Sequence, residues 1–182
     1  MKKGSSKYFY NAKVLTLSAM LTAISVVIAS VCKVIPFFNF GIGLRITFEN
    51  LPIIMAGILF GSTVGGCVGL ATDIISCLIA GMAPIPLVTV GATLIGVIAG
   101  AVSKCFMRKN GISNIIFSVV ASHIIGSIII KSLGLWGYYY NWSGSGVTLL
   151  LRIPIYIGVG IFETILLCVL LKNSAIRKVI DR

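Results

Sequence analysis

The sequence predicts an all-α membrane protein with several transmembrane helices. Of its 182 residues, 58% are hydrophobic and only 10% are charged, whereas a typical soluble domain has about a quarter of its residues charged. The apolar residues form runs of roughly 20, the length that crosses a bilayer as a helix. A soluble fold, a disordered chain and a disulfide scaffold are therefore excluded. A membrane β-barrel is excluded as well, because no run alternates polar and apolar residues.

Six apolar runs predict the helices of a single transmembrane domain, because hydrocarbon forces each span to pair its backbone groups internally. The first run follows several lysines and resembles a secretory signal near Val31 and Cys32. Val31 is larger than the residue that a cleavage site needs, and the run continues to Ile35, so it is predicted to remain as a helix. The expected spans are residues 14–35, 45–60, 62–80, 87–106, 113–133 and 147–171.

The second span has a polar beginning that includes Arg45, Glu49 and Asn50. Pro52 removes a backbone donor and disfavours helix at Leu51. We therefore expect this start to be kinked or partly unwound.

Small residues recur at intervals of four in the second, third and fourth spans. In lipid such positions let helix backbones approach closely, since no hydrophobic effect acts between helices there. Ala19 and Ala23 in the first span form a similar pair, which could equally face a second protein. Tight packing within the bundle is the expected role of Gly57, Gly61, Gly65, Gly69, Ala92, Gly96 and Gly100.

Basic residues gather on one side of the predicted bundle. With both termini in the cytoplasm, eleven of the fifteen Lys and Arg residues lie in cytoplasmic segments, as the positive-inside rule requires. The other four are Lys33, Arg45, Lys131 and Arg152, each near the outer end of its helix. This placement explains the net charge of +11 without binding to nucleic acid.

Ionisable residues inside the spans form the candidate site, because a charge in hydrocarbon needs a partner, a watery cavity or a ligand. Several cations with few acids near the outer side indicate an outward-opening pocket for an anionic solute. Glu163 lies about 16 Å farther along the same helix and is too far away to pair with Arg152. The Arg152 guanidinium therefore suits bidentate binding of a ligand carboxylate. The candidates are Arg45, Glu49, Asp73, His123, Lys131, Arg152 and Tyr156.

Several of these candidates also have a structural alternative. Lys33 and Lys131 could snorkel to the headgroups, and Arg45 could neutralise Glu49 one helical turn away. His123 fits a hydrogen-bonded packing residue better than a ligand contact. For Asp73, a role in binding and an interhelical hydrogen bond are equally expected.

A loop without charges is expected between the last two spans, at residues 134–146, and it holds five aromatic rings. Such rings can form an aromatic belt at the membrane interface. They can equally form a lid that stacks on a flat heterocycle, with Trp136 and Trp142 as its largest rings.

No enzyme signature accompanies these residues. The sequence has no GxxxxGK[ST] phosphate loop, no HExxH or GxSxG motif, and no Cys and His spacing typical of a metal site. We expect a protein that is not an enzyme and has no cofactor or metal. ATP used for transport would have to be hydrolysed by a partner protein.

Several short motifs resemble those of the substrate-binding S components of energy-coupling factor (ECF) vitamin transporters, and among these the folate family. The resemblance covers about residues 13–172. Gly61-Ser62 replaces the usual Gly-Pro after the second helix, at a cytoplasmic turn. The motifs are RITFENLPI at 45–53, AGILFG at 56–61, Asp73, residues 86–91, HIIGS at 123–127, residues 131–135 and RIPIY at 152–156.

The resemblance implies a division of labour in a bacterial plasma membrane. The S component would capture a vitamin outside the cell. A transmembrane scaffold subunit and two cytoplasmic ATPase subunits would drive the vitamin inward by toppling the bundle in the bilayer. Ala19 and Ala23 match the small-residue motif that contacts the scaffold subunit.

Folate also suits the residues, because it joins a flat pterin with hydrogen-bond donors to a glutamate tail with two carboxylates. Another vitamin such as pantothenate, or a small carrier that works without partners, remains an alternative. Riboflavin fits less well because it lacks carboxylates. The expected ligands are Asp73 or Glu49 for the pterin, Arg45, Lys131 and Arg152 for the tail, and the segment from Trp136 to Trp142 as a lid.

Overall fold

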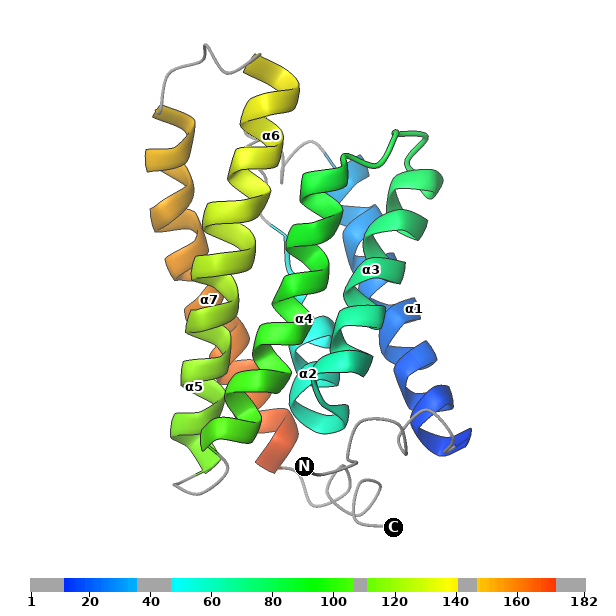
Figure 1. Cartoon of the computed structure of the whole chain (residues 1–182), viewed down its shortest axis with the longest axis vertical. Helices are drawn as coiled ribbons and strands as arrows, with labels where there is room; N and C mark the ends of the chain where they lie inside the picture. Colours follow the sequence, from blue (N-terminus) through cyan, green and yellow to red (C-terminus); the bar gives the residue numbers. More distant parts are fainter. Residues whose placement is uncertain (1–11, 36–46, 107–110, 141–146, 173–182) are drawn as a thin grey trace, which may run out of the picture.

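The computed structural model describes residues 12–35, 47–106, 111–140 and 147–172, and within these ranges it contains helices and no strand (Figure 1). For residues 34, 106, 111, 136, 138–140 and 147–152 it describes the backbone alone. The helices are α1 (Ala12–Val34), α2 (Asn50–Phe60), α3 (Ser62–Ile79), α4 (Pro86–Phe106), α5 (Gly111–Ser122), η2 (His123–Ile130), α6 (Lys131–Tyr140) and α7 (Val147–Lys172). The segments α5, η2 and α6 follow one another without a break and form one long helix, in which η2 is a π-helix.

In the described part of the chain, five helical segments are long and apolar enough to cross a membrane, and they are residues 12–33, 62–79, 86–105, 112–135 and 153–172. The exception is α2, whose 11 residues span about 16 Å, roughly half of the hydrocarbon thickness. It begins at Asn50, five residues later than the expected span, and Thr47 to Glu49 are not helical. Pro52 thus falls in the first turn, where its missing N–H costs no helical hydrogen bond.

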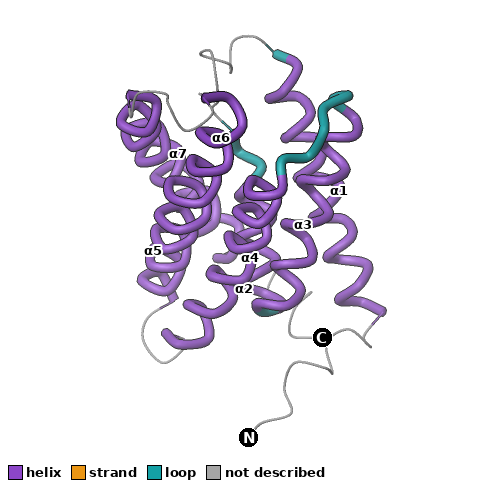
Figure 2. The backbone as a smooth tube through the Cα atoms, turned by 45° about the horizontal axis from the view of Figure 1, so that its top comes forward, coloured by secondary structure: helices purple, strands orange, loops and turns teal. Residues whose placement is uncertain are grey.

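Successive helices run in opposite directions, so the start of α1 and the end of α7 lie at the same end of the bundle (Figure 1). Lys13, Lys104 and Lys172 are close to this end, while Lys33 ends α1 at the opposite one. The described loops before α2 and between α3 and α4 lie toward this opposite end (Figure 2). The short α2 occupies the end near the start of α1, so the chain enters it part-way through the bundle.

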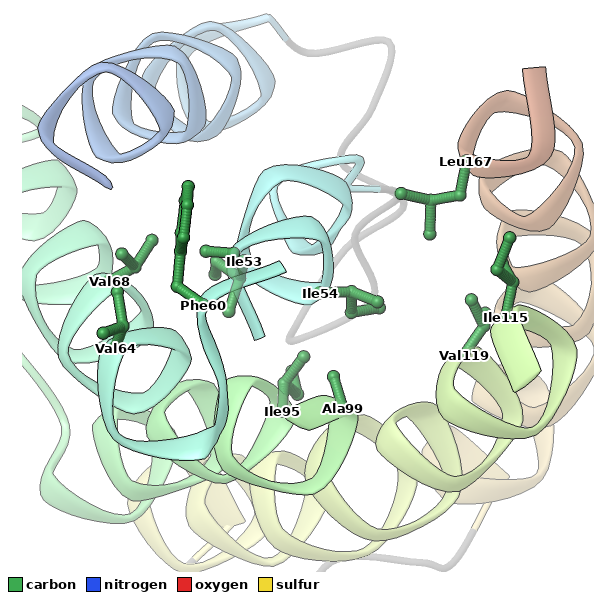
Figure 3. Packing of buried hydrophobic residues seen from close by; sticks show 11 residues of the cluster. Ile53, Ile54, Phe60, Val64, Val68, Ile95, Ala99, Ile115, Val119 and Leu167 are labelled. Atoms are coloured by element: carbon green, nitrogen blue, oxygen red, sulfur yellow. The ribbon is translucent and has the colours of Figure 1, made fainter. Parts of the chain in front are cut away.

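The core surrounds α2, which packs against α1, α3 and α4. Its Ile53 and Ile54 are almost completely buried and point to opposite sides, toward α3 and toward α5 and α7 (Figure 3). The remaining members of this apolar cluster are Ala56 and Phe60 of α2, Val64 and Val68 of α3, Ile95 and Ala99 of α4, Ile115 and Val119 of α5, and Leu167 of α7.

Glycines allow α2, α3 and α4 to meet backbone to backbone. A Cβ atom added to Gly65 would lie 2.6 Å from the Cα of Gly57 and 2.6 Å from the carbonyl oxygen of Gly96. A Cβ atom added to Gly96 would overlap the carbonyl of Gly65. The tight packing predicted from the spacing of small residues is confirmed. Gly61, with φ +93°, also makes the turn between α2 and α3 in a conformation that side chains disfavour.

Candidate functional site

The first part of the site lies where α2 begins, inside the bundle. Lys131, the first residue of α6, donates from Nζ to Oε1 of Glu49 at 3.0 Å and to Oδ1 of Asn50 at 3.3 Å. Ser25 of α1 donates to the backbone carbonyl of Glu49 at 2.6 Å and fixes the approach to α2. The non-helical entry thus brings a carboxylate and an amide to a lysine more than 80 residues away in the sequence.

Burial makes this group costly to disturb. The side chains of Lys131 and Glu49 are 5% and 12% exposed. Such an ion pair contributes little net stability, but the loss of one partner leaves an uncompensated charge in the interior. Lys131 binds the oxygen end of the Asn50 amide, and Nδ2 at the other end has no hydrogen-bond acceptor among the described atoms.

A second buried ion pair joins η2 to α7. Nε2 of His123 lies 2.6 Å from Oε2 of Glu163, and the two side chains are 5% and 0% exposed. The other ring nitrogen, Nδ1, lies 3.3 Å from Oγ of Ser127. Both ring nitrogens therefore have protein partners, as expected for a hydrogen-bonded packing residue.

Asp73 makes an interhelical hydrogen bond, the structural role that the sequence left open. It is buried on α3, and its Oδ2 accepts from the hydroxyl of Thr89 on α4 at 2.6 Å. Ser76, one turn later, donates to the backbone carbonyl of Asp73 and accepts from Nζ of Lys33 at 2.7 Å. The carboxylate is thus held in a fixed position between α3 and α4.

These groups are electrostatically connected. Lys131 interacts with the charges of Glu49 and Asp73 and with the Tyr156 side chain. Glu163 interacts with Lys131 and Glu49 in addition to His123. The two ion pairs and Asp73 therefore form one polar cluster within an otherwise apolar bundle.

Two structural alternatives were expected for these residues, and the structure excludes the one for Lys131. Lys131 does not snorkel, since it is buried and paired with Glu49. Glu49 precedes the first helical residue of α2, and its pairing with Arg45 stays a prediction. Arg45 itself lies outside the described residues.

The aromatic segment differs from the expected loop. The helix continues through α6 to Tyr140, so Trp136 lies on a helix, five residues after Lys131. Residues with high turn preference, such as Gly134 and Gly137, are accommodated because the helix packs on α4: a Cβ atom added to Gly134 would lie 2.7 Å from the Cβ of Leu87. Trp142 lies outside the described residues.

The remaining candidates fall on α7. Tyr156 is buried, with its ring centre 5.8 Å from that of His123, so the structure brings it to the polar cluster. Arg152 lies on the same helix one turn earlier, and only its backbone is described. The same holds for Trp136 on α6.

Sequence reasoning missed Asn50, Glu163 and Ser127 as members of the cluster. The partner of Glu163 is His123, which lies on another helix. Both residues lie at mid-span without a partner nearby in the sequence, and this shared need for a partner is the signal that could have predicted their contact. For Asn50 the only signal was its position beside the unwound start of α2.

An apolar groove between α5, η2 and α7 is a separate feature. Its volume is about 400 Å³, and exposed isoleucines such as Ile116, Ile157 and Ile161 line it, with His123 and Tyr156 among its other lining residues. Its lining lacks Glu49, Asn50 and Lys131. Among the described residues, no group of three or more His, Cys, Asp or Glu side chains is placed to hold a metal ion.

Comparison with protein families identifies the chain. Residues 13–174 match the family described as ECF transporter, substrate-specific component. Neither curated proteins nor solved structures give a significant match. Such components associate with ECF scaffold and ATPase subunits and bind a small-molecule substrate, so they are transporter subunits and not enzymes. With five helices among the described residues that are long and apolar enough to cross a membrane, the chain is a multi-pass membrane protein that belongs to the family of ECF transporter substrate-specific components.

Proposed function

We propose that this chain is the folate-binding subunit of an ECF importer in a bacterial plasma membrane, with ATP hydrolysis by its partner subunits driving delivery inward. The observation that carries the proposal is the buried group of Lys131, Glu49 and Asn50. It combines a cation, a carboxylate and an amide donor with no acceptor among the described atoms, where α2 begins part-way through the bundle. Folate offers the complementary groups, which are adjacent N–H donors on the pterin and two carboxylates on the tail.

The pterin is assigned to Glu49 or Asp73. Each of these carboxylates is already oriented by a donor from another helix, Lys131 for Glu49 and Thr89 for Asp73. An ionised carboxylate accepts about four hydrogen bonds, so these contacts leave acceptor capacity for ligand donors. A preorganised acceptor loses little entropy when the ligand binds.

The glutamate tail is assigned to Lys131, Arg152 and Arg45. An ammonium group has three N–H donors, and Glu49 and Asn50 accept from two of those on Lys131. The third has no acceptor among the described residues and is assigned to a ligand carboxylate. Arg152, on α7 one turn before the buried Tyr156, would add the bidentate contact that a guanidinium makes with a carboxylate.

The aromatic residues are assigned to closure over the ligand. Trp136 follows Lys131 on α6, and Tyr156 on α7 lies beside the polar cluster. Trp142 lies between these two helices in the sequence. Rings on both sides would stack on the flat pterin, with His123 contributing to the packing beneath it.

The scaffold subunit is assigned to the exposed face of α1. Ala19 and Ala23 are exposed there, among the exposed apolar side chains of Leu15, Met20 and Val27. Small residues on a lipid-facing helix allow a partner helix to approach closely. This arrangement supports a contact through which partner ATPases act on the bundle.

Titration of the purified protein in detergent with folate, pantothenate and riboflavin tests the substrate. Tryptophan emission and calorimetry should both report saturable binding of folate alone, at nanomolar to low micromolar concentration. Arg152→Ala should weaken folate binding at least tenfold, since a charge-assisted hydrogen bond contributes about 1.5–3 kcal/mol. The exposed Lys172→Ala serves as the control. Binding of pantothenate in place of folate would refute the assignment of the vitamin.

Uptake into liposomes tests the dependence on partners. The chain alone should bind folate without ATP-driven uptake. Uptake should start when the scaffold and ATPase subunits are added and ATP is supplied on the side of the membrane that carries the ATPase subunits. Sustained uptake by the chain alone would identify a self-sufficient carrier.

A further inference from the structure

We infer that Glu163 is a positioning residue of the substrate site, which acts on Lys131 through His123 and Ser127. Glu163 lies on α7 and contributes no atom to the group around Asn50. Its effect on ligand affinity rests on the proposed function, whereas its effect on the ligand-free protein does not.

The first step is the contact between Glu163 and His123. With Glu163 ionised, its carboxylate only accepts hydrogen bonds, and the Nε2 atom of His123 at 2.6 Å is then the donor. In the neutral ring Nδ1 is then an acceptor, and the hydroxyl of Ser127 is its donor at 3.3 Å. Glu163 thereby selects the tautomer that holds Ser127.

The second step runs along the π-helix. Ser127 also accepts at its backbone carbonyl from the hydroxyl of Ser132 at 3.4 Å, and the backbone N–H of Lys131 donates to the carbonyl of Gly126, five residues earlier. All of these residues are buried. The chain of contacts from Glu163 through His123 and Ser127, called the relay below, therefore ends at the turn that carries Lys131.

The winding of η2 decides where Lys131 points. A π-turn contains one residue more than an α-turn, so it changes the direction of every later side chain by about 100°. If η2 rewound as an α-helix, Lys131 would turn away from Glu49 and Asn50 toward a different face. The His123–Glu163 pair ties η2 to α7 and stabilises the π form.

The polar surroundings support this role. The charged and titratable groups that act on Glu163 are His123, Lys131 and Glu49, and those that act on Lys131 include Tyr156 and Asp73. Oε1 of Glu163 has no partner among the described residues, so the carboxylate contacts this part of the bundle through Oε2 alone. The contact of Oε2 with His123 at 2.6 Å thus links this carboxylate of α7 to the substrate site.

The first test is made without ligand, because the chain contains one histidine and its imidazole gives one set of NMR signals. In ¹⁵N-histidine-labelled protein, the wild type should show a protonated Nε2 with a strongly downfield proton, and Glu163→Gln should shift both signals. Thr164→Val, which removes only a bond to its own helix backbone, should leave them in place. Signals that are identical in wild type and Glu163→Gln would overturn the proposal.

The second test is a double-mutant cycle on folate affinity. Glu163→Gln should weaken folate binding about tenfold in the wild-type background, but by less than about twofold when Lys131 is already methionine, because the two residues act in series. Equal losses in both backgrounds would show that Glu163 does not act through Lys131. If Glu163→Gln fails to fold, Ser127→Ala breaks the same relay, and its effect on folate affinity is compared in the same two backgrounds. A wild type that binds no folate contradicts the proposed vitamin, and the imidazole signals then decide on the relay alone.

Discussion

Gly65→Ala is expected to destabilise the bundle by separating three helices at once. The new Cβ would lie 2.6 Å from the Cα of Gly57 and from the carbonyl oxygen of Gly96. Both are backbone atoms, so no side-chain rotation relieves the overlap. Helix α3 would have to move by about 0.8 Å from both neighbours to reach an ordinary contact of 3.4 Å, and a gap of that size loses a quarter to a half of the dispersion attraction of each facing atom pair.

The expected loss follows from this displacement. Overpacking a well-packed interior costs about 1–3 kcal/mol, and we expect about 2–3 kcal/mol because two interfaces, α3 with α2 and α3 with α4, must open together. For a chain of this size the apparent melting temperature should fall by about 4–12 °C. Thermal unfolding in detergent, followed by far-UV circular dichroism, measures the shift.

Gly158→Ala is the matched control. It makes the same substitution on α7, where an added Cβ would meet no atom of the described residues within 4 Å. Alanine favours helix over glycine by up to about 1 kcal/mol, so this variant should be as stable as the wild type or slightly more stable. If both variants melt at the same temperature, the close approach at Gly65 is not what limits stability.

Three other substitutions test the site and the partner surface. Lys131→Met should destabilise the protein by about 3 kcal/mol, because it leaves a buried carboxylate unpaired. The added substitution Glu49→Gln should recover most of that loss in the same thermal assay. Additive losses of the two substitutions would contradict the pairing. Thr89→Val should weaken folate binding about tenfold in calorimetry by freeing the carboxylate on α3, and an unchanged affinity would exclude that carboxylate as a ligand. Ala19→Leu should abolish ATP-driven uptake by the reconstituted complex without changing folate affinity. The control Ala101→Leu, on the exposed face of α4, should change neither uptake nor affinity. Equal uptake by the two variants would exclude the proposed contact.

The regular part of the fold could be predicted from the sequence, because it depends on local patterns. Apolar length located the helices, and the four-residue spacing of glycines located the close contacts between α2, α3 and α4. Pro52 indicated an irregular start of the second helix, and residues 47–49 are indeed not helical. Each of these signals lies within one segment, so no knowledge of neighbouring helices was required.

The pairing of charges could not be predicted in the same way. The contact of Glu49 with Lys131 depends on where α2 starts and on how α6 is turned, and neither is visible in the residues around Glu49. His123 and Glu163 are 40 residues apart, and no local pattern marks their contact. The winding of η2 is equally invisible, since HIIGSIII reads as an ordinary apolar stretch.

Two departures from regular membrane helices meet at the same place in this bundle. Helix α2 is too short to cross the membrane, so a non-helical backbone enters the interior, where Ser25 satisfies the carbonyl of Glu49. Such backbone is tolerated at this depth only when protein groups or a water-lined cavity satisfy it. The π-helix η2 ends directly before Lys131, which reaches the side chains at that entry. Sequences that depart from local rules are expected to do so at functional sites. The coincidence of both irregularities at one buried cation therefore supports the start of α2, rather than the apolar groove beside α7, as the place where substrate binds.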